Sequence, residues 1–270
     1  MKQFQSSISP EIRSQILSQL SEVEQTEGVR ILFAIESGSR AWGFPSPDSD
    51  YDVRFVYARP ADWYLSIHPG RDVIERPIED DWDVNGWDIQ KALGLLLKPN
   101  PVLLEWLSSP VRYIWHDDVC EKLIQFSGQV AHGLACLNHY RRLGERQWNT
   151  YIDGRDEISL KKYLYVVRPA MAIRWTRLHP EIIPPMNFQA LLDGCDLDAQ
   201  TTQRLASILE AKSKAKELGT GAREPLIDAL VQSEFEHARH AASEIEKSRV
   251  DLRPEADRLF REIIKDMNYD

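Results

Sequence analysis

Two aspartates separated by one residue offer the clearest chemistry in this chain. Asp50 and Asp52 stand just before the apolar run 53–57, and the pair Gly38 and Ser39 precedes them. Side chains at positions i and i+2 of a strand point to the same face of a sheet, so the two carboxylates can hold divalent metal ions together. A Gly-Ser turn nearby can hold the phosphates that such metals bridge. The combination indicates nucleotidyl transfer.

Two apolar segments must position these side chains. Residues 31–35 are strand formers and predict a strand buried on both faces. This strand ends near Gly38, where a backbone without a Cβ atom lets a ligand approach closely. Residues 40–43 predict a short helical turn whose free N–H groups favour an anion. Residues 45–49 are loop formers, and the alternation that follows them predicts the second strand. We therefore assign nucleotide binding to Gly38, Ser39 and Arg40.

The order of these parts resembles the DNA polymerase β-type nucleotidyltransferase superfamily. An apolar strand is followed by Gly-Ser, ten residues, Asp-x-Asp and a second apolar strand. The sequence GSRAWGFPSPDSDYDVR is similar to one branch of the superfamily, the predicted bacterial nucleotidyltransferases associated with RNA repair. The similarity continues over residues 85–110 and 161–175. The resemblance implies an α+β catalytic domain with a small mixed sheet, followed by a helical bundle. It also implies two Mg²⁺ ions, an NTP substrate and an RNA acceptor such as a tRNA end.

A third carboxylate is implied by the same resemblance, because the superfamily completes its metal site from a later strand. The candidates are Asp80, Asp81, Asp83 and Asp88. Residues 72–78 and 84–89 predict two strands, and the first three candidates lie in the polar turn between them. The resemblance favours Asp88, which has apolar neighbours, as metal ligand and proton acceptor. Asp88 can also cap the helix that is predicted over residues 89–98.

A basic segment interrupts an otherwise acidic chain. The formal net charge of −9 argues against a protein that simply coats nucleic acid. Residues 139–177, however, hold nine Lys/Arg and four Asp/Glu, a local net charge of +5. Lys161, Tyr165 and Arg168 share one face of a predicted helix there. This face is either a solvated surface or a positive wall that binds triphosphate or an RNA backbone, and we favour the second interpretation.

Composition is typical of a two-domain enzyme. The chain of 270 residues is long enough for a catalytic domain over 1–116 and a helical domain over 117–270. Because the sequence has no apolar run of transmembrane length and no signal-peptide pattern, we expect a cytoplasmic protein without a membrane partner. Cys120, Cys136 and Cys195 lack the spacing of a metal site, so we expect packing roles in a reducing compartment and no zinc.

Two alternatives share the predicted fold. One is nucleotidyl transfer to a small molecule or to a protein hydroxyl, as in aminoglycoside-type and antitoxin-type relatives. The other is a non-catalytic binding module. Modules of that kind usually lose a metal carboxylate, whereas Asp50 and Asp52 are both present. The nucleotide, the acceptor and the oligomeric state stay open at this point.

Overall fold

The computed structural model describes residues 8–77, 81–214, 220–244 and 250–266. Their contacts form two compact units. The sheet unit comprises Ser6–Ala41, Asp50–Val130 and Arg249–Asp270, and the helical unit comprises Met1–Gln5, Trp42–Ser49 and Ala131–Ser248. These units have other limits than the predicted catalytic domain over 1–116 and helical domain over 117–270. The predicted domains therefore stay a prediction.

A mixed five-stranded sheet is the centre of the sheet unit, as the α+β prediction requires. Its strands lie in the order β3-β4-β2-β1-β5. They are β1 (Arg30–Glu36), β2 (Tyr51–Ala58), β3 (Val73–Glu75), β4 (Trp82–Asp88) and β5 (Arg112–Trp115). β1 is antiparallel to β2 and β5, and β3 is antiparallel to β4. β2 and β4 run parallel, so they begin at the same end of the sheet.

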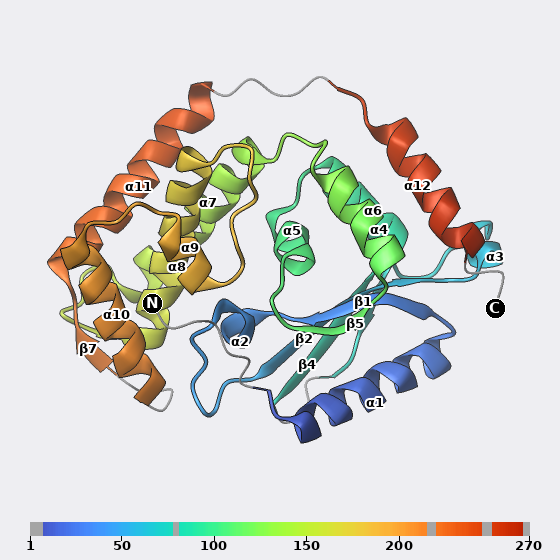
Figure 1. Ribbon diagram of the computed structural model, residues 1–270, viewed down its shortest axis with the longest axis horizontal. Coiled ribbons are helices and arrows are strands. Elements are labelled where there is room, and N and C mark those ends of the chain that lie inside the picture. The colour runs from blue at the N-terminus through green and yellow to red at the C-terminus, as the bar shows by residue number, and fades with distance from the viewer. Residues whose placement is uncertain (1–7, 78–80, 215–219, 245–249, 267–270) are drawn as a thin grey trace. The chain divides into compact units, whose positions relative to one another are not determined.

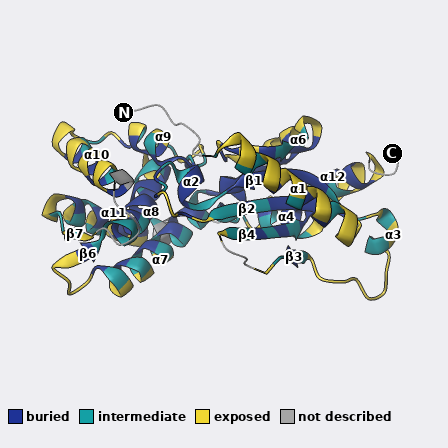
Figure 2. Cartoon of the chain, turned by 90° about the horizontal axis from the view of Figure 1, so that it is seen from below, coloured by how far each residue is buried: buried dark blue, intermediate teal, exposed yellow. Residues whose placement is uncertain are grey.

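Helices cover both faces of this sheet (Figure 1). α1 (Pro10–Glu27) lies on one face, and α4 (Ile89–Leu97), α5 (Pro101–Leu107) and α6 (Asp117–Ser127) lie on the other. The short α2 (Gly38–Trp42) and α3 (Ala61–Tyr64) follow β1 and β2, and α12 (Arg253–Asp266) packs on α4. Figure 2 shows the strands in blue and teal, with the exposed yellow surface on the outer sides of α1 and α6.

The first helix, α1, has a capped start and a glycine end. The Ser9 hydroxyl accepts a hydrogen bond from the N–H of Ile12, and Pro10 occupies the first helical position. Ile16 and Leu20 are buried against the sheet, and Gly28 ends the helix in the left-handed conformation. The amphipathic pattern thus fixes which face of α1 covers the strands.

The described residues of the helical unit form five helices and a two-stranded ribbon. These are α7 (Gly133–Tyr151), α8 (Leu160–Leu178), α9 (Phe188–Asp193), α10 (Ala199–Lys214) and α11 (Pro225–Glu244), with β6 (Glu157–Ser159) paired to β7 (Thr220–Ala222). α7, α8 and α11 pack on one another. α8 runs through Pro169 without a break. Gly144 of α7 allows the close packing, because a Cβ atom there would lie 2.5 Å from the Phe235 ring.

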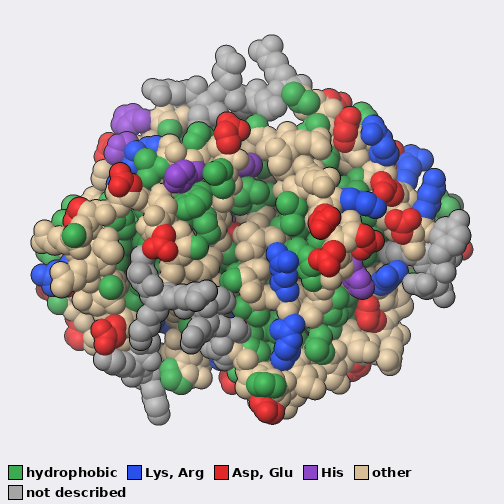
Figure 3. Space-filling view, in the orientation of Figure 1, with side chains coloured by type: hydrophobic (Ala, Val, Ile, Leu, Met, Phe, Trp, Pro, Cys, Tyr) green, Lys and Arg blue, Asp and Glu red, His purple; other side chains and the backbone are tan. Residues whose placement is uncertain are grey.

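Charges of both signs are interspersed on the surface of α12 (Figure 3). Lys122 pairs with Glu262 at 2.6 Å, and Arg261 pairs with Asp257 at 3.0 Å. This surface is a solvated, charge-balanced helix face. Among the described residues, no helix combines the length and the apolar character that crossing a lipid bilayer requires.

Candidate active site

Three strand ends meet at one end of the sheet. β1 ends there, with Glu36 opposite Val53 of the antiparallel β2. β2 and β4 both begin there, because they are parallel and pair Tyr51 with Trp82. The turn through Gly38 leaves β1 at the same end. Residues that are distant in the sequence are thereby brought to one place.

Asp52 and Asp83 face each other across the parallel strands. The register pairs them directly, and adjacent strands lie about 4.8 Å apart. Their side chains are 28% and 32% exposed, so both carboxylates reach solvent. Asp50 lies just before β2 and is exposed. Alternation along an extended backbone would direct its side chain to the same face as Asp52. Asp52 and Asp83 thus face each other at this strand end, and Asp50 lies two residues before Asp52.

Asp88, the predicted third carboxylate, lies at the opposite end of β4, away from the Asp52–Asp83 pair. It pairs with Tyr57, five residues beyond the Asp52–Asp83 pair, or about 16 Å along the strand. A shift of five residues also places it on the other face of the sheet. Its carboxylate accepts hydrogen bonds from the N–H of Gln90 at 2.7 Å and the hydroxyl of Tyr64 at 2.9 Å.

The alternative role of Asp88 is confirmed, because it is the N-cap of α4. Burial raises the pKa of this carboxyl, whose residue is 1% exposed. Of the other candidates, Asp81 lies in an exposed turn and Asp80 lies outside the described residues. Asp83 belongs to β4 itself, not to the turn in which the sequence pattern placed it. Of the four acidic candidates, it is the one that pairs directly with Asp52.

Gly38 lies against the carboxylate of Asp52. Its φ of +57° is in the left-handed region that glycine adopts without strain. A Cβ atom at this position would lie 1.8 Å from Oδ2 of Asp52. The N–H of Ser37 donates to the carbonyl of Asp52 at 2.8 Å and fixes the approach. Ser39, at the start of α2, is 5% exposed.

Glu36, which the sequence pattern did not mark as a site residue, binds the backbone of Asp52. One carboxylate oxygen accepts the backbone N–H of Asp52 at 3.1 Å, and the other accepts the hydroxyl of Tyr113 at 2.6 Å. The residue is fully buried. Burial raises the pKa of Glu36 to about 7. An acid at the end of an otherwise apolar strand is the sequence signal that could have marked it.

Arg54 joins the two facing carboxylates, and it was also missed. Its Nη2 lies 3.2 Å from Oδ1 of Asp52 and 2.6 Å from Oδ2 of Asp83. Its Nη1 donates to the carbonyl of Asp83 at 2.7 Å. Arg54 follows Asp52 by two residues on the same strand, so the two side chains share a face of the sheet. This spacing is the sequence signal that could have identified Arg54.

Arg40 holds the start of β2 and lies beside Asp50. Its Nε donates to the carbonyl of Asp50 at 3.1 Å. Its guanidinium lies 3.9 Å above the ring of Tyr51, which stacks on Trp82 at 5.0 Å. Arg40 is 6% exposed. Arg40 therefore holds the backbone and the aromatic ring on either side of the start of β2.

The donor set fits Mg²⁺ in chemistry. Carboxylate oxygens are the ligands that this hard cation takes from proteins, and the missing side chain at Gly38 lets the Asp52 carboxylate lie against the backbone of the turn. Within the described part of the chain, no three acidic, His or Cys side chains converge as metal ligands do. Two of the carboxylates, those of Asp52 and Asp83, are bound to the guanidinium of Arg54.

The predicted nucleotide-binding residues of α8 belong to the helical unit. There, Tyr165 and Arg168 contact residues 42–49, which we call the motif loop. The Tyr165 ring meets Trp42 edge-on at 5.3 Å, and the Arg168 guanidinium lies 4.6 Å over the same indole. Arg168 also donates to the carbonyl of Met186 at 3.2 Å and is 3% exposed. Both side chains thus hold the motif loop, and Lys161 is half-buried at the start of the helix.

Further contacts fix the motif loop within the helical unit. Lys212 of α10 is buried, donates to the carbonyl of Phe44 and lies 5.4 Å from the centre of its ring. Gln189 donates to the carbonyl of Gly43 at 2.9 Å. The segment between the Gly-Ser pair and Asp50 is therefore shaped by residues that come more than a hundred positions later in the chain.

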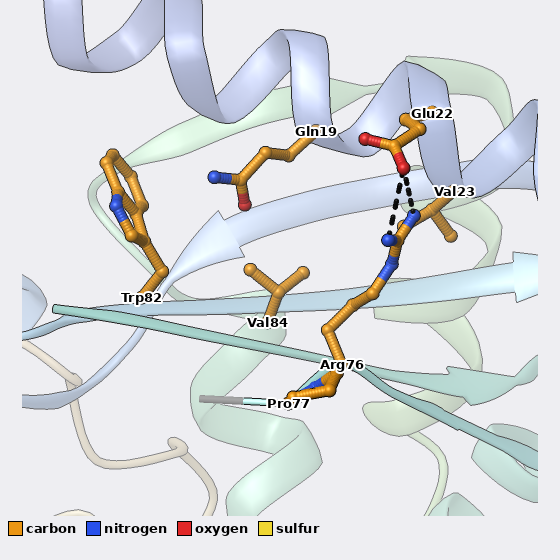
Figure 4. Close-up of a pocket in the computed structure, with 7 residues that line it drawn as sticks. All are labelled: Gln19, Glu22, Val23, Arg76, Pro77, Trp82 and Val84. Carbon is orange, nitrogen blue, oxygen red and sulfur yellow. Dashed lines mark hydrogen bonds and ion pairs between the residues drawn. The ribbon is translucent and has the colours of Figure 1, made fainter. Parts of the chain in front are cut away.

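A cavity of about 340 Å³ opens between α1 and the sheet (Figure 4). It is lined by Gln19, Glu22, Val23, Arg76, Pro77, Trp82 and Val84. Glu22 and Arg76 form an ion pair at 3.2 Å along its wall. Trp82 and Val84 alternate with Asp83 along β4, so the cavity lies on the sheet face opposite the carboxylates. It is separate from the candidate site.

The mixed sheet and the motif order define a class, the nucleotidyltransferases of the DNA polymerase β type. The model of the RlaP family, described as the RNA repair pathway DNA polymerase beta family, matches residues 12–262, and the chain belongs to this family. Nucleotidyltransferases of this fold use a nucleoside triphosphate and a divalent metal. The sequence resemblance to the RNA-repair branch is thereby confirmed.

Two similar proteins extend the comparison. The chain is 39% identical over 256 residues to the uncharacterized protein YcgL of Bacillus subtilis (strain 168), covering 95% of this chain and 98% of that protein. A solved structure, a nucleotidyltransferase-like protein from Exiguobacterium sibiricum 255-15, shares 13% identity over 85% of this chain and 75% of its own, with a TM-score of 0.29.

Proposed function

We propose that this protein transfers a nucleoside monophosphate from an NTP to a hydroxyl group at an RNA end, such as that of a tRNA. The observation that carries the proposal is the direct pairing of Asp52 with Asp83 beside Gly38. Facing carboxylates at a strand end suit two Mg²⁺ ions, and the turn without a Cβ atom lets the Asp52 carboxylate lie next to the backbone N–H groups that would bind phosphate.

Each residue of the candidate site has its own role in the proposed reaction. Asp50, Asp52 and Asp83 would hold the two metal ions, which supply neutralisation of phosphate charge and activation of the acceptor hydroxyl. Asp83 accepts the proton of that hydroxyl. Gly38 and Ser39 cradle the β- and γ-phosphates. The hydroxyl oxygen bonds to the α-phosphorus, the bond to the β-phosphate breaks, and pyrophosphate leaves.

The RNA acceptor is supported by the family's description and by the local net charge of +5 over residues 139–177. Several basic side chains there are already engaged. Arg174 and Arg177 bind the buried Glu234 at 2.9 and 3.0 Å. Arg142 and Arg146, in contrast, are exposed, lie one turn apart on α7, and form no ion pair within the residues that the structure describes. We assign RNA backbone binding to these two arginines.

One experiment tests the reaction and the acceptor together. The protein is incubated with Mg²⁺, each labelled NTP in turn, and separate RNA, protein and small-molecule fractions of a cell extract. Label in RNA supports the proposal, label in another fraction replaces the acceptor, and no label in any fraction overturns the proposed activity. Asp52→Asn is the inactive control. Asp88→Asn is its matched partner, because it removes an equal charge at the far end of β4.

A further inference from the structure

Arg54 contacts both carboxylates of the candidate site through one nitrogen atom. Nη2 lies 3.2 Å from Asp52 and 2.6 Å from Asp83. The side chain is 18% exposed, which is less than either carboxylate. It is held in place by its Nη1, which donates to the carbonyl oxygens of Val53 at 3.1 Å and Asp83 at 2.7 Å.

Like charges directly opposite each other on neighbouring strands destabilise a sheet. Asp52 and Asp83 are in that position, and both are partly shielded from water. A guanidinium group can compensate two carboxylates at once, because its donors are spread in a rigid planar fork. Arg54 therefore supplies a cation that both carboxylates contact in the metal-free protein.

A metal ion that binds both carboxylates must compete with this guanidinium for the same oxygen atoms. We propose that Arg54 is an internal counter-cation, a positioning residue that holds Asp52 and Asp83 together in the metal-free protein and releases them when divalent metal binds. The inference rests on the proposed metal-dependent function. The contact to Asp52 is the longer of the two, and the bond to the carbonyl of Asp83 does not involve a carboxylate. Arg54 can therefore release both carboxylates and remain tied to the backbone of β4.

Removal of the charge should have opposite effects on stability and on metal affinity. In Arg54→Met, the metal-free protein should melt at a lower temperature, because two facing carboxylates lose their cation. Its dissociation constant for Mn²⁺ should fall on the order of tenfold, since the metal no longer displaces a competitor. A side chain with a merely structural role would lower the melting temperature and leave the metal affinity unchanged.

Two further variants separate charge from packing. Arg59→Met removes a similarly shielded arginine, 14% exposed, that follows the far end of β2 and contacts Glu27 at 3.5 Å. It should lower the melting temperature with and without Mn²⁺ and leave the metal affinity unchanged. Arg54→Lys keeps the charge but not the planar fork, so its Mn²⁺ affinity should lie between those of the wild type and Arg54→Met. This variant also tests the inference if Arg54→Met does not fold.

The experiment titrates Mn²⁺ alone into each protein and follows free Mn²⁺ by electron paramagnetic resonance, with thermal melts in parallel. Tighter binding by Arg54→Met together with a lower metal-free melting temperature supports the inference. Unchanged or weaker Mn²⁺ binding by the Arg54 variants overturns the inference. The proposed function still stands in that case if the wild type binds Mn²⁺ and the Asp52→Asn variant does not. Absence of Mn²⁺ binding by the wild type itself overturns both the inference and the metal-dependent function.

Discussion

A methyl group at Gly38 would lie 1.8 Å from a carboxylate oxygen of Asp52. The overlapping atoms all belong to the side chain of Asp52, so a methyl group here can be accommodated only if that side chain moves. Gly38 also has a positive φ. Two separate features, the backbone conformation and the contact with Asp52, therefore favour glycine at this position. A second glycine, Gly28, has a similar φ of +62° but nothing within 4 Å of an added Cβ atom. The two positions therefore separate backbone strain from contact with Asp52.

Gly38→Ala should abolish nucleotidyl transfer, whereas Gly28→Ala should not. Each substitution should cost about 1 kcal/mol of unfolding free energy for the positive φ. Only Gly38→Ala displaces Asp52, and displacement of a reacting group by about 1 Å can cost about a hundredfold in rate. The measurement compares label transfer and urea unfolding for both variants. Equal activity of the two proteins would contradict the placement of Gly38 in the site.

Asp83→Asn should inactivate the protein, and Asp88→Asn should leave its activity unchanged. An amide at position 83 neither takes a proton nor balances metal charge, so turnover should fall about 10²- to 10⁴-fold. An Asn at position 88 can still cap α4, because Asn and Asp are comparable N-caps. Single-turnover label transfer measures the first effect, and thermal melts of the second variant test the cap. Loss of activity in Asp88→Asn alone would restore the original prediction from the sequence.

Local chemistry explains why much of the fold could be predicted. The cap at Ser9 and the apolar spacing of Ile16 and Leu20 suffice to define α1, and apolar runs with turn residues between them define β1 and β2. The resemblance then supplied the family and its mixed sheet. Each of these features is determined by residues within one element or one turn of it.

The third carboxylate depends on information of another kind. Asp83 and Asp88 both have apolar neighbours, and only the parallel register of β2 with β4 decides which one faces Asp52. That register is a long-range property of the sheet. The interpretation of Arg168 as a phosphate ligand did not consider its burial against Trp42, which also comes from a distant segment. Spacing alone predicts which side chains share a face but not what covers that face.

Glu36 should make the stability of the metal-free protein depend on pH. Its pKa is about 7 in the folded state and 4.5 as an ordinary glutamate. The folded state therefore binds more protons between these values, and the contribution present below pH 4.5 is lost as the pH rises through 7. The loss amounts to about 3 kcal/mol for a shift of this size. Urea unfolding at pH 5 and pH 8, with a chelator present, should show this slope.

Glu36→Gln is the matched variant for that slope. The amide keeps an oxygen that can accept the N–H of Asp52 but has no proton to lose in this range. The difference in unfolding free energy between pH 5 and pH 8 should therefore be smaller than in the wild type, with the variant relatively more stable at pH 8. An identical pH dependence in the two proteins would show that Glu36 titrates at its ordinary value.

The last prediction decides whether the basic face of α7 binds RNA. Arg142 and Arg146 are exposed and one turn apart, so neutralising both as Arg142→Gln/Arg146→Gln should weaken RNA binding. Each lost contact to a single-stranded RNA phosphate should reduce the slope of log K against log salt by about 0.7. Affinity for NTP should stay the same, because the triphosphate is assigned to Gly38 and Ser39. Fluorescence anisotropy at several salt concentrations measures both quantities.

The control for that measurement is a second pair of exposed arginines on a helix. Arg258 and Arg261 of α12 are 74% and 70% exposed and have acidic partners. Their replacement by glutamine removes the same formal charge from a face of mixed sign, so the salt dependence of RNA binding should stay close to that of the wild type. Equal loss in both double variants would mean that only net charge matters. No loss in either would return α7 to a solvated helix face and move the acceptor site elsewhere.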